Sequence, residues 1–131
     1  MIVLDASVVI EMLLRTSLGK RLDEDLAGRH VVWSAPHLLD TEVLQVLRRL
    51  VIVKELTSDH AAMAVEDLQA LDIVRHPHDE STARVWQLRH KLSAYDATYL
   101  ALAESMAATL VTCDSSFDKI PERRAVVELC K

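Results

Sequence analysis

The stretch Lys91–Asp118, KLSAYDATYLALAESMAATLVTCDSSFD, decides the fold that we expect for this chain. Its apolar first half predicts a helix over Ser93–Ala107 that is buried on nearly every side. The β-branched run Thr109–Thr112 then predicts a short buried strand. Carboxylates flank this unit, because Asp96 lies in the first helical turn and Asp114 comes where the strand stops. A buried helix–strand unit with an acid at each end indicates a functional site.

Short apolar strands alternate with helical segments along the rest of the chain. Further strands are expected at Ile2–Leu4, Val31–Trp33, Leu71–Val74 and Ala125–Leu129. Further helices are expected at Ala6–Leu14 and Thr16–Gly28, from Ser34 as N-cap to about Val53, from Ser58 to near Ala70, and at His78–His90 with Trp86 on its inner side. The alternation indicates crossover units, so we expect an α/β fold, with a parallel sheet covered on both faces, in a single domain over residues 1–131.

The composition fits one domain with a substantial core, because half of the 131 residues are apolar and only two are glycine. A net charge of −5 argues against a broad basic surface, although not against local basic stretches. Two cysteines, Cys113 and Cys130, are too few for a disulfide framework and suit a reducing compartment. No apolar run approaches the roughly 18–20 residues of a membrane helix. We therefore expect a cytoplasmic protein with no membrane association.

Glu42 is the most informative single acid of the chain. On a helical wheel, Leu39, Val46, Leu50 and Val53 form one apolar stripe, and Glu42 falls inside it. A carboxylate on the core-facing side of a helix is costly unless it is paired or bound to a metal. The position of Glu42 therefore suggests a site.

Asp5 resembles Asp114, because it also ends an expected strand. Sites in open parallel sheets form beyond the carboxyl ends of the strands, where the winding direction reverses. We therefore expect Asp5 and Asp114 to be neighbours at that edge, with Glu42 and Asp96 brought there by the starts of their helices. Clustered carboxylates repel one another, and a hard divalent cation removes the repulsion. Ligands that are all oxygen atoms favour Mg²⁺ or Mn²⁺.

Each acid also has an ordinary structural explanation. These alternatives are an N-cap for Asp5, a salt bridge from Glu42 to Arg84 or Arg89, a capping box between Ser93 and Asp96, and a cap or Asx-turn for Asp114. Asp118 is either a fifth ligand or a solvated surface acid.

Four stretches in this order carry a family resemblance: IVLDAS, APHLLDTEVLQVLRR, LRHKLSAYDATYLALAE and LVTCDSSF. Together they resemble the PIN-domain nucleases, and most closely the VapC-type toxins of bacterial toxin–antitoxin pairs, over Ile2 to Leu129. The resemblance implies a three-layer α/β/α domain whose five-stranded parallel sheet has the order 3-2-1-4-5. It also implies Mg²⁺-dependent endoribonuclease activity, dimerisation, and assembly with a cognate VapB-type antitoxin. The implied acidic quartet is Asp5, Glu42, Asp96 and Asp114; Asp118 is not assigned by it.

We expect Asp5, Asp96 and Asp114 to hold the metal, and Glu42 or a coordinated water to handle proton transfer. The expected substrate is single-stranded or looped RNA. Candidate substrate contacts are Ser7, Thr112, Arg84 and Arg89. Apolar residues beyond the needs of one buried stripe predict a homodimer through Leu44, Leu47, Val51 and Ile52.

Three rival functions are weighed against these residues. A phosphatase with an aspartate nucleophile places a second Asp two residues after the first, where this chain has Ser7. A signalling receiver needs an acid at the end of its central strand, but the third expected strand ends without one. A non-catalytic binding module, whose acids only cap helices, is separated from a nuclease by an RNA cleavage assay with and without EDTA.

Overall fold

The computed structural model describes residues 1–131 and contains one five-stranded sheet in the order β3-β2-β1-β4-β5, with every neighbouring pair parallel. The strands are β1 Ile2–Leu4, β2 Trp33–Pro36, β3 Ile73–His76, β4 Thr109–Thr112 and β5 Val127–Leu129. The helices are α1 Ala6–Leu13, α2 Ser17–Gly28, α3 Leu38–Ile52, α4 Ser58–Ala70, α5 Thr82–Gln87 and α6 Ala94–Ser105, with 3₁₀ helices η1 Asp79–Ser81 and η2 Ser115–Lys119. The expected fold class and strand order are confirmed.

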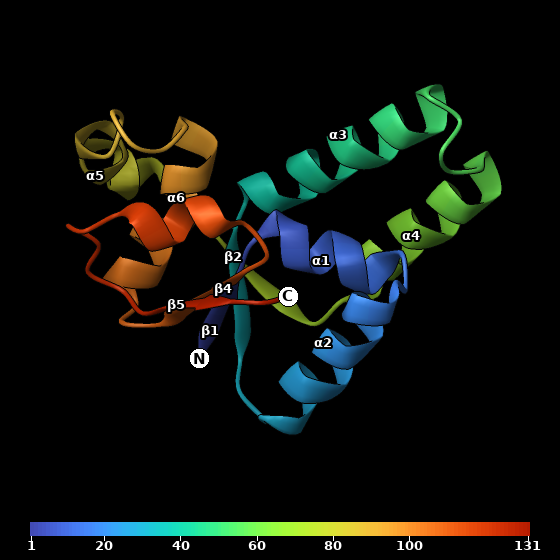
Figure 1. Cartoon of the computed structure of the whole chain (residues 1–131), viewed down its shortest axis with the longest axis horizontal. Coiled ribbons are helices and arrows are strands. Elements are labelled where there is room, and N and C mark those ends of the chain that lie inside the picture. The colour runs from blue at the N-terminus through green and yellow to red at the C-terminus, as the bar shows by residue number, and fades with distance from the viewer.

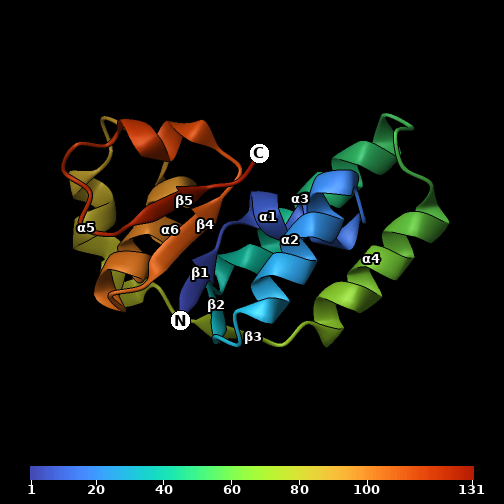
Figure 2. The same cartoon turned by 60° about the horizontal axis from the view of Figure 1, so that its bottom comes forward.

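The helices cover the sheet on both sides. Helices α1 to α4 lie on one side, and α5 and α6 lie on the other (Figures 1 and 2). Helix α6 contacts β1, β2 and β4, while α1 contacts β4 and α3 contacts β2. The result is a three-layer α/β/α domain. None of its helices combines the length and hydropathy required to cross a membrane.

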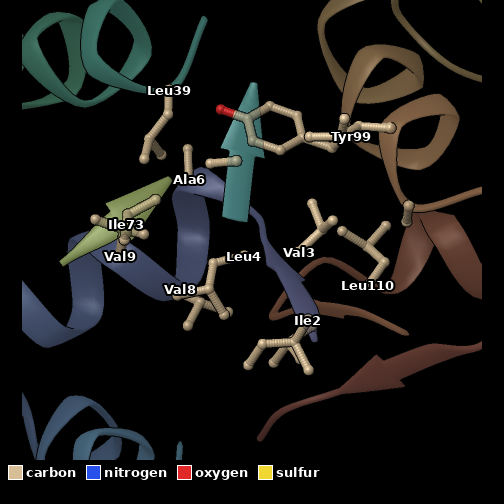
Figure 3. Packing of buried hydrophobic residues seen from close by; sticks show 14 of the residues in the cluster. Ile2, Val3, Leu4, Ala6, Val8, Val9, Leu39, Ile73, Tyr99 and Leu110 are labelled. Carbon is tan, nitrogen blue, oxygen red and sulfur yellow. The ribbon is translucent and has the colours of Figure 1, made fainter. Parts of the chain in front are cut away.

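The core is built around β1 and α6. Strand β1 is buried throughout, and Val3 and Leu4 are fully inaccessible to solvent. Figure 3 shows Leu110 next to Val3 of this strand, and Tyr99 beside the neighbouring strand β2. Helix α6 is buried continuously from Ala97 to Ala103, as its apolar sequence predicts. Asp96 immediately precedes this buried run, so the packing of α6 fixes where its carboxylate lies.

Strand β2 differs from the sequence expectation. Ser34 was expected to cap a helix, but it lies inside the strand and pairs with Val3 on one side and Val74 on the other. Helix α3 therefore begins only at Leu38. Pairing on both sides of a central strand outweighs the local Ser-x-Pro signal for a helix start. Pro36 is the last residue of β2, so its missing N–H interrupts no bond within the strand.

The segment between β3 and α6 also differs. The expected helix His78–His90 is divided into η1 and the short helix α5. Trp86, expected on the inner side, is 66% exposed, and Leu88 is fully buried. The 3₁₀ turn changes the helical phase, so a wheel drawn through the whole segment places the wrong residue inside. Strand β3 likewise begins at Ile73 instead of Leu71.

The buried stripe of α3 is rotated slightly from the expected one. It consists of Leu39, Val43 and Leu47, whereas Val53 lies beyond the helix end and is 55% exposed. Glu42 therefore borders the core instead of lying at its centre, and is half-buried.

Candidate functional site

Asp5 is the most deeply buried acid of the site. It follows β1, is 5% exposed, and its Oδ2 accepts hydrogen bonds from Ser7 Oγ at 2.8 Å and Thr112 Oγ1 at 2.7 Å. The same two hydroxyls accept backbone N–H groups from the end of β4. Ser7 Oγ accepts from Cys113 at 3.0 Å, and Thr112 Oγ1 accepts from Asp114 at 3.0 Å. Ser7 and Thr112 thus fasten Asp5 to the segment that carries Asp114.

The capping alternatives hold to different degrees. Asp5 occupies the N-cap position of α1, but its side chain makes no capping hydrogen bond. Ser93 caps α6 by accepting the Asp96 N–H at 3.1 Å, whereas no hydrogen bond from the Ser93 N–H to the Asp96 carboxylate completes a capping box. Asp114 Oδ1 accepts the Ser116 N–H at 2.9 Å and therefore does cap η2. Capping accounts for one oxygen of Asp114, and it does not account for Asp5.

Glu42 forms no salt bridge with either expected arginine. Its Oε1 is buried without a hydrogen-bond partner, and the hydroxyl of Tyr99 is buried in the same condition. Tyr99 lies one helical turn after Asp96 and is fully buried. In Figure 3 its ring extends from α6 with the oxygen directed toward the start of α3. Tyr99 is not among the residues expected from the sequence, although a lone phenol three residues after Asp96, in a run of Ala and Leu, is the signal that indicates it.

The charges of the four acids act on one another. Burial raises the pKa of Asp96 to about 6, and repulsion from Asp5 and Asp114 adds to the effect. Burial also raises the pKa of Asp5, although the hydroxyls of Thr112 and Ser7 oppose the shift. The pKa of Glu42 is raised by burial and by repulsion from Asp5 and Asp96, and is lowered by the Tyr99 hydroxyl. The structure thus brings Glu42, Asp96 and Asp114 within electrostatic reach of Asp5.

The donor set suits a hydrated hard cation. No three His, Cys, Asp or Glu side chains are grouped closely enough to enclose a metal ion by themselves. Mg²⁺ usually keeps several waters and takes only one or two carboxylates directly, so an open acidic cluster is compatible with it. The four acids offer only oxygen ligands, and one of these oxygens, Glu42 Oε1, is buried without a hydrogen-bond partner. This chemistry fits Mg²⁺ or Mn²⁺ better than zinc.

The two arginines predicted as substrate contacts do not touch the four acids. Arg84 Nε donates to Glu104 at 2.7 Å, and its Nη2 donates to the Glu122 carbonyl at 3.0 Å. Arg89 Nη1 donates to the Trp86 carbonyl at 2.8 Å. No hydrogen bond or ion pair links Arg84 or Arg89 to the four acids, and the substrate role of both residues stays a prediction. Asp118 lies in η2 with an exposed side chain and is likewise unconnected to the site.

Tyr99→Phe and Glu42→Met are expected to be coupled in their effects on stability. Neither Glu42 Oε1 nor the Tyr99 hydroxyl meets the geometry of a hydrogen bond, but the Tyr99 hydroxyl is close enough to lower the pKa of Glu42. Each single change removes this interaction and leaves one buried polar atom facing an apolar group, at a cost of about 1–3 kcal/mol, whereas changing both can be nearly neutral. Urea unfolding in EDTA of the wild type, the two single variants and the double variant measures the coupling. Tyr95→Phe is the matched control, because Tyr95 is on the same helix and 62% exposed. Strictly additive free energies of unfolding would show that the two groups do not interact.

Comparison with known proteins places this site in a family. The chain matches the PIN domain model over residues 2–123. It is 37% identical over 130 residues to Ribonuclease VapC12 of Mycobacterium tuberculosis, covering 98% of each chain. It is 34% identical to Ribonuclease VapC1 of the same organism, covering 98% of this chain and 97% of the relative.

Solved structures agree in fold. VapBC2 from Rickettsia felis, bound to a DNA fragment from their promoter, superposes with a TM-score of 0.71 at 14% identity over the whole of both chains. FitAcB from Neisseria gonorrhoeae gives 0.68 at 23% identity, covering 97% of this chain and 96% of that one. At these identities the likeness shows the shared fold alone. The family match and the VapC relatives decide the assignment: the chain belongs to the PIN-domain family, among its VapC members.

Proposed function

We propose that this chain is a metal-dependent endoribonuclease and the toxin of a VapBC-type toxin–antitoxin pair. The observation that carries the proposal is the acidic cluster at the carboxyl end of the sheet, where burial and mutual repulsion raise the pKa of Asp5, Glu42 and Asp96, and where Asp114 adds to the repulsion on Asp5 and Asp96. The curated relatives are named as ribonucleases. A structural neighbour is a toxin-antitoxin complex from Klebsiella pneumoniae, with a TM-score of 0.65. A VapB-type antitoxin is accordingly the proposed protein partner.

Asp5, Asp96 and Asp114 would hold Mg²⁺, or Mn²⁺ in its place. When bound, the ion would supply activation of an attacking water and neutralisation of charge on the scissile phosphate. Ser7 and Thr112 keep Asp5 in a fixed orientation through their two hydrogen bonds to Oδ2. Their hydroxyls are therefore assigned a positioning role in place of the expected direct substrate contact.

Glu42 is the proposed proton acceptor. Burial raises its pKa, and a general base works best when its pKa is close to the operating pH. Its Oε1 has no hydrogen-bond partner in the protein, which leaves it available as a proton acceptor. Ser7, in the position of the second Asp of an aspartate-nucleophile phosphatase, is occupied in holding Asp5, which gives no support to that rival function.

The test is cleavage of single-stranded RNA by the purified chain. We expect cleavage with Mg²⁺ or Mn²⁺ and none with EDTA. Asp114→Asn, which can keep the cap on η2 through its amide oxygen, is the matched negative control. Intact RNA with every divalent metal, under conditions where the chain is folded, would contradict the proposal.

A homodimer is expected through the surface between α3 and α4. A groove of about 380 Å³ lies there, lined by Leu44, Leu47, Arg48, Val51, Ile52, Ser58, Ala61, Ala62 and Val65. Leu44 is 45% and Ile52 is 59% exposed, whereas Leu47 is only 3% exposed and belongs to the core. An apolar surface of this kind is a liability unless it is covered.

Light scattering at micromolar concentration should give the mass of two chains for the wild type. Ile52→Glu should give one chain, because a charge on the apolar surface opposes its burial. Val126→Glu, a matched change at a residue 68% exposed outside the groove, should remain dimeric. A wild type that scatters as a monomer would rule this interface out.

A further inference from the structure

The segment Ser81–Tyr95, which spans α5 and the turn into α6, differs in character from the rest of the chain. It contains no Asp or Glu, although the chain has 20 acidic residues and a net charge of −5. Aromatic residues make up only 4% of the sequence, yet this segment exposes Trp86 by 66% and Tyr95 by 62%. Exposed aromatic rings interleaved with cations are typical of surfaces that bind single-stranded nucleic acid.

The side chains of this segment are held in place. The guanidinium carbon of Arg89 lies 4.5 Å from the centroid of the Trp86 ring, and Arg89 Nη1 donates to the Trp86 carbonyl at 2.8 Å. Leu88 and Leu92 are buried, and the backbone N–H groups of Lys91 and Leu92 both donate to the Leu88 carbonyl at 3.0 Å. The two buried leucines therefore fix the turn to the core, while Arg89 and Lys91 remain exposed.

The turn leads directly into the acidic site. Ser93 caps α6, Tyr95 follows, and the next residue is Asp96. Figures 1 and 2 show α5 beside α6 on the same side of the sheet. A cluster of four acids repels the phosphates of RNA, so binding energy has to come from a neighbouring surface of opposite charge.

We propose that Trp86, Arg89, Lys91 and Tyr95, here called the α5–α6 patch, bind unpaired bases and phosphates of single-stranded RNA beside the carboxylate site. The inference rests on the proposed nuclease function and names the surface that holds its substrate. Trp86 and Tyr95 offer ring faces for base stacking, which tolerates any base. Arg89, already lying against one ring, and Lys91 contact the phosphates.

A second copy of the chain is a poorer occupant of the patch. Pairing across a twofold axis would place Arg89 and Lys91 of one copy near their equivalents in the other, and like charges at an interface are unfavourable. A polyanion meets no such repulsion at this surface. The patch also differs from the α3–α4 groove, whose lining is mainly apolar.

Binding can be measured without cleavage, on the full chain in EDTA at low salt. The probes are a labelled single-stranded RNA oligonucleotide of mixed sequence, read by fluorescence anisotropy, and the same sequence as a duplex. Trp86→Ala should weaken single-strand binding by about tenfold, because loss of one stacked base costs about 1–3 kcal/mol. Trp86→Phe should restore most of the affinity, since it retains a ring. Arg89→Glu should weaken binding and flatten its dependence on salt.

Arg21→Glu is the matched charge control, because Arg21 is an exposed arginine on α2. It should change the affinity by less than about twofold if binding is local to the patch. Tryptophan emission gives a direct signal as well, because the only other tryptophan, Trp33, is half-buried in β2. Single-stranded RNA should quench the wild type and leave Trp86→Phe nearly unchanged.

Several results would overturn the inference. The first is that neither Trp86→Ala nor Arg89→Glu alters the affinity for single-stranded RNA, and the second is that the duplex binds with equal affinity. The third is that the wild type does not bind RNA. The fourth is that Trp86→Ala converts a dimer into a monomer and leaves the RNA affinity intact. If the wild type cleaves RNA and Trp86→Ala leaves KM unchanged, the patch fails and the proposed function stands. If no variant cleaves RNA, the proposed function fails, and the titration in EDTA still decides the patch.

Discussion

Asp5→Asn is expected to abolish RNA cleavage without unfolding the chain. Both hydroxyl donors, Ser7 Oγ and Thr112 Oγ1, converge on Oδ2 of Asp5. An asparagine that places its amide oxygen there keeps both hydrogen bonds. The change removes the negative charge and replaces the other oxygen, Oδ1, with an NH₂ group. Loss of even an outer-shell partner of a metal costs about 10–100-fold in activity, so loss of a proposed ligand should cost at least about 100-fold.

The measurement is the rate of Mg²⁺-dependent cleavage, with thermal melting in EDTA as the check on folding. Burial raises the pKa of Asp5, so the ionised carboxylate lowers the stability of the metal-free protein. The Asp5→Asn variant should therefore melt at no lower a temperature than the wild type. Asp72→Asn is the matched control, because Asp72 is exposed and precedes β3, at the opposite end of the sheet. Full activity in Asp5→Asn, or equal losses in both variants, would remove Asp5 from the site.

Much of the fold could be predicted because its central elements are short, buried and locally consistent. The strands Ile2–Leu4 and Thr109–Thr112 have the expected bounds, because in both cases the strand ends where the apolar run ends in the sequence, shortly before an acid. Ser34 is where the prediction failed. Its local sequence suits a helix start equally well, and only the pairing of β2 with β1 and β3 decides for a strand. Such long-range pairing cannot be predicted from the neighbouring residues in the sequence.

The acids of the site could be found from the sequence, but their partners could not. A carboxylate at the end of an apolar strand can be recognised in the sequence. The bond from Thr112 to Asp5, in contrast, requires residues about a hundred positions apart to meet, and so does the contact between Ser7 and Thr112. Arg84 illustrates the opposite case. It was expected to serve Glu42 or the substrate, and its side chain is fixed by Glu104 on α6. Which carboxylate an arginine meets depends on how two helices pack, and helical spacing within one of them cannot show it.

Asp96→Asn is expected to separate a metal site from a set of helix caps. The first turn of α6 favours a negative charge by about 0.3–1 kcal/mol. Burial and the charges of Asp5 and Asp114 outweigh this, because the pKa of Asp96 is raised to about 6. The ionised carboxylate therefore destabilises the metal-free protein, and in EDTA the Asp96→Asn variant should melt at the same temperature as the wild type or at a higher one. Ser93 keeps its cap in both proteins, since it accepts the backbone N–H.

The pH dependence has a definite sign. The ordinary pKa of 3.8 lies below the folded value of about 6, so the cost of the charge is fully present above that value and fades as the pH falls through it. The advantage of Asp96→Asn in EDTA should therefore be largest near pH 8 and shrink toward about pH 5. If the advantage is constant across this range, the raised pKa of Asp96 is not its cause.

Adding metal should reverse the ranking of the two proteins. A ligand that binds only the folded state stabilises it by about 2.7 kcal/mol at a hundredfold excess over Kd. The wild type should gain this from millimolar Mg²⁺ or Mn²⁺, whereas Asp96→Asn should gain far less, because one of its three proposed ligands is neutral. Melting of both proteins near pH 8, with EDTA and with each metal, gives the values needed. If Asp96→Asn melts well below the wild type in EDTA and neither protein responds to metal, the acids serve only as caps and polar contacts of the fold. If the wild type alone responds, the repulsion stored among Asp5, Asp96 and Asp114 is what the cation relieves.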